Sequence, residues 1–117
     1  MDKEYLIGKI TKILLDKKCR NVLAIDVSAK TDVTEAYILC TAKNPPQAKS
    51  TYEEICAVLE NEGIYTLGVD GLREGKWIVM DYDKVIVHIF HTNMRDQYRF
   101  EELWSEPDES NVTRFEE

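Results

Sequence analysis

The amino-acid sequence predicts a single α/β (α+β) domain, a mixed five-stranded sheet flanked by helices in the order αββαβββα. With 117 residues and 44% hydrophobic composition, the chain can bury about two-thirds of its unfolded surface in one core. Two segments carry apolar residues at helical spacing, and five short runs are rich in β-branched residues. Closely spaced runs form antiparallel pairs, whereas a strand, a helix and a strand in succession permit a parallel pair.

The N-terminal third is predicted to form a helix and then two strands. Five apolar residues recur at three- and four-residue intervals and so lie on one stripe of a helix over residues 2–18: Leu6, Ile7, Ile10, Ile13 and Leu14. Residues 19–21 end this helix. The β-rich runs 22–27 and 37–41 follow, and the polar segment between them is typical of a hairpin.

A second helix is predicted to begin after Asn44. The Asn44 side chain can cap free backbone amides, and Gln47 can reach back to the helix start. Pro45 occupies the first helical position, where a backbone N–H would have no partner within the helix. The apolar face of this helix consists of Ala48, Tyr52, Ile55, Cys56 and Leu59. Gly63 supplies the left-handed residue at which such helices end.

Three further strands and a short helix complete the predicted order. The strands are expected over residues 64–69, 77–80 and 85–90. The tight polar link from Asp81 to Lys84 favours a hairpin between the last two strands. Thr92 or Asn93 then caps a helix that ends near Trp104, because Pro107 prevents much continuation.

The charge of the chain is acidic and uneven. Fifteen basic and 22 acidic residues give a net charge of −7, which repels phosphate backbones and argues against free nucleic acid as a ligand. We therefore expect residues 1–104 to form the domain and the acidic residues 105–117 to be a solvated, disordered extension. The alternative is that this extension folds back on the domain through Val112 and Phe115.

Membrane insertion and a disulfide framework are both disfavoured. No apolar run reaches the roughly 18 residues needed to span a bilayer, and the first residues lack the apolar centre of a secretory signal, so we expect a soluble, cytoplasmic protein. The three cysteines, Cys19, Cys40 and Cys56, include no C-x-x-C pair. Reduced and mostly buried thiols are the expected state.

The last third of the chain carries a specific motif. The segment WIVMDYDKVIVHIFHTNMRDQYRFEELW matches in register the pattern W-x-hydrophobic-x-D-Y, V-x-V-H-x-F, R and Y-x-x-E-x-L-W. The matching residues are Trp77, Asp81, Tyr82, Val85, Val87, His88, Phe90, Arg95, Tyr98, Glu101, Leu103 and Trp104. In these residues the chain resembles the ribosomal silencing factors, also called the Iojap or RsfS family. It departs from the family at four places. Ala42-Lys43-Asn44-Pro45 replaces a loop that usually has Gly and Ser, and Asp70-Gly71 replaces the usual Glu-Gly. In the last helix, Gln97-Tyr98 and Phe100-Glu101 replace the commoner Tyr-Tyr and Leu-Glu.

The resemblance implies a function without an enzymatic reaction or a cofactor. Members of the family bind the large ribosomal subunit through protein 14 on its inter-subunit face, block a bridge to the small subunit and repress translation. Their fold is similar to the nucleotidyltransferase fold, and they commonly form homodimers. The partner-binding residues implied here are Trp77, Asp81, Tyr82, His88, Phe90, Arg95, Tyr98, Glu101 and Trp104.

The residue types are compatible with a protein partner. An acidic domain is attracted to a basic ribosomal protein, and aromatic side chains can anchor it: Trp77, Tyr82, Tyr98 and Trp104. Core and contact roles are equally expected for Trp77, contact or dimer packing is favoured for Trp104, and Leu103 is assigned to the core with Val87 and Ile89. Arg95 with Asp96 and Glu101 with Glu102 are explained by local ion pairing, or Glu101 meets a basic residue of the partner.

A rival function of another class is a magnesium-dependent nucleotidyltransferase. Asp81 and Asp83 lie two apart on an extended segment and can share a cation, with Asp26 or Asp32 as a third carboxylate. Against this, the chain lacks the Gly-Ser phosphate loop, and such a pair across a hairpin is commonly a solvated turn. A metal between His88 and His91 is disfavoured, because those strand positions point to opposite faces. His88 is expected on the sheet face with a hydrogen bond.

Overall fold

The computed structural model describes residues 2–91, 95 and 99–116 of the chain. Its elements are α1 (Lys3–Asp16), β1 (Arg20–Asp26), β2 (Ala36–Ala42), α2 (Pro45–Glu60), β3 (Gly68–Asp70), β4 (Trp77–Asp81), β5 (Val85–His91), α4 (Phe100–Trp104) and β6 (Val112–Phe115). Within the described residues, no helix is both long enough and apolar enough to cross a bilayer.

The strands form one mixed sheet in the order β3-β4-β5-β2-β1-β6. The central pair, β2 and β5, is parallel, and the other four pairs are antiparallel. The chain reaches β5 from β2 by way of α2 and the β3–β4 hairpin, so the crossover helix packs on the sheet, as expected for a parallel connection. The predicted mixed sheet is confirmed.

The sheet has six strands, and the predicted number of five is wrong. The sixth strand, β6, comes from the acidic C-terminal segment and lies beside β1, with Val112 opposite Ile25 and Phe115 opposite Val22. The Asp26 backbone N–H also donates to the Asn111 carbonyl at 2.8 Å. The expectation of a disordered extension is therefore corrected. Val112 and Phe115 supply apolar side chains, and β1 has an edge with unpaired backbone groups, so this segment pairs with the sheet.

Helix α1 follows the predicted stripe. The Asp2 carboxylate caps it by accepting a hydrogen bond from the Tyr5 backbone N–H at 2.7 Å, and Leu6, Ile10 and Leu14 are buried against the sheet. The helix ends at Asp16, two residues before the predicted end. It therefore has the cap and the apolar face that its sequence predicts.

Helix α2 begins where the sequence predicts. Asn44 Oδ1 accepts from the Gln47 backbone N–H at 2.8 Å, and Gln47 Oε1 accepts from the Lys43 backbone N–H at 2.6 Å. This reciprocal pair satisfies donors at the helix start. After the helix, Gly63 adopts a positive φ of +80°, which confirms its role in the helix stop.

Two later elements are shorter than predicted. The third strand comprises only Gly68–Asp70, because the preceding segment forms loop contacts such as that of the Thr66 hydroxyl with the Asp81 carbonyl at 2.9 Å. Helix α4 is described from Phe100, and the predicted caps Thr92 and Asn93 lie outside the described residues.

The turn before β4 depends on Gly71, where φ is +78° and a Cβ would stand 1.9 Å from the Trp77 carbonyl oxygen.

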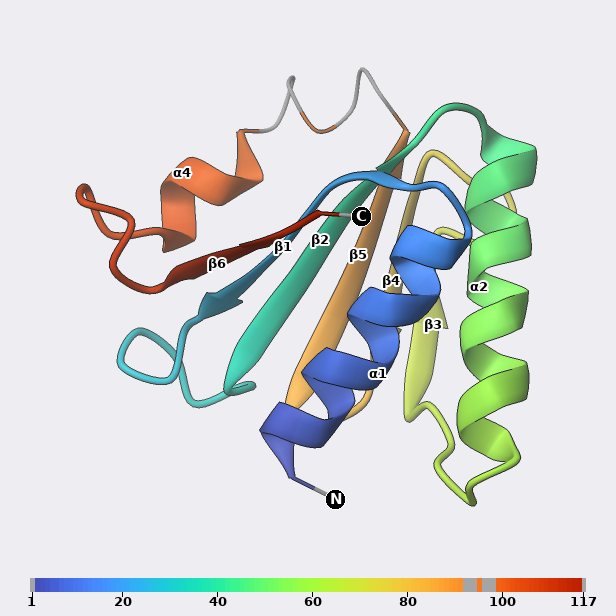
Figure 1. Cartoon of the computed structure of the whole chain (residues 1–117), viewed down its shortest axis with the longest axis horizontal. Coiled ribbons are helices and arrows are strands. Elements are labelled where there is room, and N and C mark those ends of the chain that lie inside the picture. Colours follow the sequence, from blue (N-terminus) through green and yellow to red (C-terminus); the bar gives the residue numbers. More distant parts are fainter. Residues whose placement is uncertain (1, 92–94, 96–98, 117) are drawn as a thin grey trace.

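The sheet separates two apolar clusters. Helices α1 and α2 lie on one face (Figure 1), and the larger cluster fills the space between them and the sheet. On the opposite face, a smaller cluster is covered by the five-residue helix α4. These two faces are called the helical face and the aromatic face below, and the aromatic face contains most of the predicted site residues.

Candidate interaction surface

Six rings gather on the aromatic face. They come from three strands and from α4: Tyr37, Trp77, His88, Phe90, Phe100 and Trp104. Register explains the gathering, because Trp77 is opposite Phe90 in the β4–β5 pair and Tyr37 is opposite Ile86 in the β2–β5 pair. Side chains that are opposite one another project from the same face of a sheet. Strand pairing therefore places rings from distant parts of the sequence together.

The rings meet α4 through short aromatic contacts. The ring centroid of Tyr37 lies 5.2 Å from that of Phe100 and 5.0 Å from that of Trp104, both edge-on. Phe100 lies 4.4 Å from His88, and Trp77 stacks on Phe90 at 4.9 Å. Edge-on and offset contacts are the favoured geometries for aromatic pairs. They hold α4 on the sheet although the helix is short.

His88 is the buried centre of this cluster. Its side chain is 5% exposed, and its Nδ1 accepts a hydrogen bond from Trp77 Nε1 at 3.0 Å. Burial lowers the pKa of His88 to about 3, so the imidazole is neutral at physiological pH. Its Nε2 is buried and has no hydrogen-bond partner among the described residues. The predicted hydrogen-bonded role on the sheet face is found, but direct partner contact is not available to this side chain.

Arg95 acts inside the domain. Its Nε donates to Glu101 Oε1 at 2.6 Å, and its Nη1 donates to the Asn21 carbonyl at 2.6 Å and to Thr41 Oγ1 at 3.0 Å. The guanidinium thus connects α4 to β1 and β2, where Asn21 lies in a register shift with a φ of +50°. Its expected partner Asp96 lies outside the described residues. Arg95 is a buried connector rather than an exposed contact.

Three other predicted contact residues have different places in the structure. Phe90 is fully buried, and Tyr82 is buried in the cluster under the helices, where burial raises the pKa of its hydroxyl. Phe90 is covered by Trp77 and Phe100, and Tyr82 faces the helical side. Neither side chain is accessible to a partner in this fold. Tyr98 lies outside the described residues.

Several predicted contact residues remain accessible on the aromatic face and on α4. Trp77, Trp104, Glu101 and Asp81 are half-buried, so each presents part of its surface to solvent. Leu103, which the sequence assigned to the core, is 70% exposed, whereas Val87 and Ile89 are buried as predicted. We define the docking strip as Trp77, Val79, Asp81, Glu101, Leu103 and Trp104. It combines apolar area with carboxylates, as protein interfaces commonly do.

Sequence reasoning missed Tyr37 and Phe100 as members of the aromatic cluster and Leu103 as part of the accessible surface. The spacing of Phe100 and Trp104, four residues apart, could have placed both on one helical face. Tyr37 lies in β2, where every residue is buried. The sequence of this strand therefore has no alternation of polar and apolar residues that would indicate the face on which the Tyr37 ring lies. Leu103 is exposed because α4 has too few residues to be enclosed on all sides.

The carboxylates proposed for magnesium do not gather. The Asp83 backbone N–H donates to Asp81 Oδ1 at 2.8 Å, and Asp83 has a φ of +70°, which is the geometry of a side-chain-capped turn. Asp26 Oδ1 accepts from Ser28, and Asp26 Oδ2 accepts from Lys3 Nζ at 3.2 Å. Across the described parts of the chain, no three His, Cys, Asp or Glu side chains are close enough to share a metal ion.

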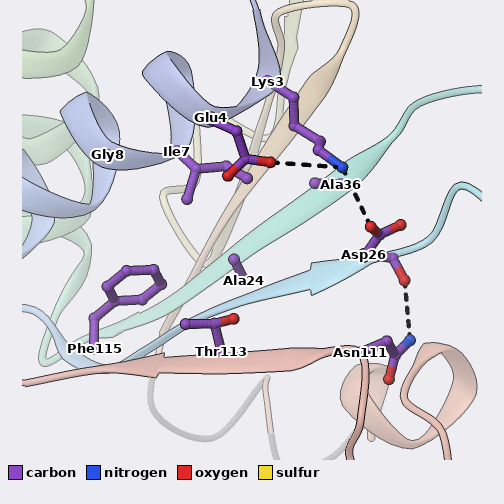
Figure 2. A pocket seen from close by; sticks show the side chains of 10 residues that line it. All are labelled: Lys3, Glu4, Ile7, Gly8, Ala24, Asp26, Ala36, Asn111, Thr113 and Phe115. Atoms are coloured by element: carbon purple, nitrogen blue, oxygen red, sulfur yellow. Dashed lines mark hydrogen bonds and ion pairs between the residues drawn. The ribbon is translucent and has the colours of Figure 1, made fainter.

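A separate groove lies on the helical side between α1 and β6 (Figure 2). It has a volume of about 350 Å³, with Ala24 and Ala36 at its floor and Ile7 and Phe115 on opposite walls. Lys3 stands at its mouth between Glu4 and Asp26, and the hydrogen bond that Lys3 Nζ donates to the Asp26 carboxylate raises the pKa of the lysine. The groove contains no residue of the docking strip.

Comparison with known proteins agrees with this architecture. The family model described as ribosomal silencing factor during starvation matches residues 1–117. The ribosomal silencing factor of Haemophilus influenzae is 30% identical over 100 residues, covering 86% of this chain and 98% of the relative. That of Bacillus subtilis is 29% identical over 91 residues, covering 78% and 77%.

Solved structures show the same fold. A crystal structure of a Chromobacterium violaceum protein superposes with a TM-score of 0.83 at 26% identity, covering 94% of this chain and 93% of that one. A Bacillus halodurans structure superposes with a TM-score of 0.79 and covers 87% and 95%. Since the family model matches the chain over its whole length, this protein belongs to the ribosomal silencing factor family.

Proposed function

We propose that this protein represses translation by binding protein 14 at the inter-subunit face of the large ribosomal subunit and blocking the small subunit. The observation that carries the proposal is the match of the entire chain to the ribosomal silencing factor family. Repression then needs no chemical step in this protein, only affinity and bulk. The protein acts in the cytoplasm, where ribosomal subunits join.

The docking strip supports this proposal physically. Exposed Leu103 and the half-buried rings of Trp77 and Trp104 offer apolar area at the centre of a contact. A buried tryptophan removes about 150–250 Å² from water, and such anchors dominate the energetics of many interfaces. Glu101 and the net charge of −7 favour a basic protein partner.

The same strip also suits a homodimer. A half-exposed aromatic surface is stabilised when a second copy covers it, so the free protein is a dimer that must open before it binds the subunit. Increasing the protein concentration would then weaken binding per molecule. Analytical ultracentrifugation of the free protein measures this equilibrium.

Subunit joining tests the proposal directly. Purified large and small subunits are mixed with and without a saturating excess of the protein, and light scattering records formation of the complete ribosome. We expect the protein to sediment with large subunits and to slow joining. Crosslinking of the sedimented complex then identifies the neighbouring ribosomal protein. Normal joining in the presence of saturating protein would contradict the proposal.

A variant control separates docking from folding. Replacing both Leu103→Ser and Trp104→Ala should remove co-sedimentation and restore joining, while far-ultraviolet circular dichroism remains native. The matched control is Val33→Ser, since Val33 is 69% exposed and lies outside the strip. Equal binding of the two proteins would exclude α4 from the contact.

A further inference from the structure

Cations are segregated at one end of this acidic molecule. Segments 17–21 and 41–49 together contain five lysine or arginine residues, and all 22 acidic residues of the chain lie elsewhere. These cations are Lys17, Lys18, Arg20, Lys43 and Lys49. A net charge of −7 therefore conceals a local excess of positive charge.

The fold brings these two segments together. The Gln47 side chain bridges them, because its Nε2 donates to the Lys17 carbonyl at 3.0 Å and its Oε1 accepts from the Lys43 backbone N–H at 2.6 Å. Strand pairing adds a second link, since Arg20 is opposite Thr41. Figure 1 shows the α1–β1 and β2–α2 connections at the same end of the molecule.

Lys76 joins this end from a third segment. The His91 backbone N–H donates to the Lys76 carbonyl at 2.7 Å, and His91 is opposite Ala42, next to Lys43. We define the basic rim as Lys17, Arg20, Lys43 and Lys76. Two acidic residues lie near this end: Glu74 in the turn that leads to Lys76, and Glu116, which lines a shallow hollow together with Arg20. The four rim cations outnumber them.

The rim differs in its pairing from four lysines that lie elsewhere on the molecule. Lys3, Lys9, Lys12 and Lys30 each lie within 4 Å of a carboxylate oxygen. Within the described parts of the chain, no rim residue has such an ion pair. Arg20, Lys43 and Lys76 are also exposed. Unpaired and exposed cations are available to an external anion.

The position of the rim beside the docking strip indicates which anion the rim contacts. Lys76 immediately precedes Trp77, so the rim borders the docking strip. We infer that, when the strip is docked on a ribosomal protein as proposed above, the rim contacts the phosphate backbone of adjacent ribosomal RNA. The acidic remainder of the molecule repels free RNA, and docking supplies the local concentration that overcomes this repulsion.

The contact uses side chains rather than the start of α2. Pro45 and Pro46 occupy the first two positions of that helix and have no N–H to donate. The Asn44 side chain already accepts from the Gln47 backbone N–H. Lysine and arginine contacts to phosphates carry no base specificity, so they strengthen docking without reading a sequence.

Salt dependence tests the inference. The rim variant Lys17→Gln, Arg20→Gln, Lys43→Gln is compared with the control Lys9→Gln, Lys12→Gln, Lys30→Gln, which changes net charge by the same amount. Binding to purified large subunits is measured by co-sedimentation across potassium chloride concentrations. Each lost phosphate contact should reduce the slope of log affinity against log salt by about 0.7–0.9, so the rim variant should lose about 2–3 in slope.

The outcomes separate the two proposals. Equal slopes and affinities for the rim variant and the control would overturn the inference while leaving the proposed function intact. Failure of the unmodified protein to sediment with large subunits would overturn the proposed function and this inference with it. Thermal unfolding of both variants near the temperature of the unmodified protein verifies that they are folded.

Photo-crosslinking distinguishes RNA from an acidic protein surface. Arg20→p-benzoylphenylalanine places a photoreactive group on the rim, and the variant is irradiated on intact large subunits. An adduct that ribonuclease shortens supports the inference. An adduct that resists ribonuclease and is digested only by protease overturns it.

Discussion

The two faces of the sheet bury different side chains under very different covers. The helical face packs mostly aliphatic residues beneath α1 and α2, which have 14 and 16 residues. The aromatic face packs rings beneath α4, which has five. One face is therefore enclosed and the other is partly open, so the aromatic face buries a core cluster while part of its surface remains accessible to a partner.

Aromatic side chains make this combination feasible. A ring can bury one edge in the sheet and present the other to a partner, whereas an aliphatic side chain has no comparable division. Trp77 shows this directly, because it stacks on the fully buried Phe90 while part of its ring remains exposed. Substitution of each ring measures how far it belongs to the interior or to the surface.

The largest effect is expected at Phe90, which should behave as an interior residue. Phe90→Ala removes a fully buried ring and its stack with Trp77, and should lower the free energy of unfolding by about 3–5 kcal/mol. Urea denaturation measures the change. Phe90→Leu is the control and should lose less than half as much. A loss below about 1 kcal/mol would show that the aromatic face is not a true core.

His88 should make the aromatic face sensitive to acid. Its pKa of about 3 in the folded protein is below the ordinary value of 6.5, so below about pH 6 the unfolded chain binds one more proton. Stability is then lost as pH falls through the window from about 6.5 to 3, by up to about 1.4 kcal/mol per pH unit.

Urea titrations at several pH values measure this dependence. His88→Gln should be less stable at neutral pH but should show a shallower loss between about pH 6 and 4. The control is Val79→Ala, which removes a non-titrating side chain opposite His88 in the β4–β5 pair and should keep the slope of the unmodified protein. Parallel curves for all three proteins would mean that His88 titrates normally.

Trp104 should affect docking more than folding. Trp104→Ala removes a half-buried ring from the strip and should weaken binding to large subunits by about 2 kcal/mol, which is about 30-fold in Kd. Trp104→Phe keeps the contact with Tyr37 and should recover most of the affinity. Unfolding of the alanine variant in circular dichroism would assign Trp104 to the core.

Tyr82 provides the contrast to Trp104. Both are aromatic residues of the sequence motif, but the Tyr82 side chain is buried on the helical face. Tyr82→Ala should therefore lower stability by about 2–4 kcal/mol, and the folded fraction should bind with unchanged Kd. Reduced affinity without reduced stability would reverse this assignment.

The smallest change in stability is expected at Leu103. Because this side chain is 70% exposed, Leu103→Ala should change the free energy of unfolding by no more than about 0.5 kcal/mol. It should nevertheless weaken docking by about 1 kcal/mol, about fivefold in Kd. Val33→Ala is the control of equal exposure and should change neither quantity.

Much of the architecture is determined by local sequence. Asn44, Pro45 and Gln47 specify the start of α2 within one residue, because capping and the missing proline N–H are properties of neighbouring residues. The stripe of Leu6, Ile10 and Leu14 specifies α1 for the same reason. The motif from Trp77 to Trp104 also identifies the family, since it depends on residue types in register.

Tertiary structure alone decided which motif residues are accessible. Tyr82 and Leu103 exchanged their expected places, because side-chain exposure depends on what covers a face and not on the residue itself. The C-terminal segment became β6 because the edge of β1 was open to it, and neither composition nor charge encodes that edge. The basic rim likewise exists only after Gln47 and strand pairing join segments that are distant in sequence, because electrostatic potential depends on distance in space.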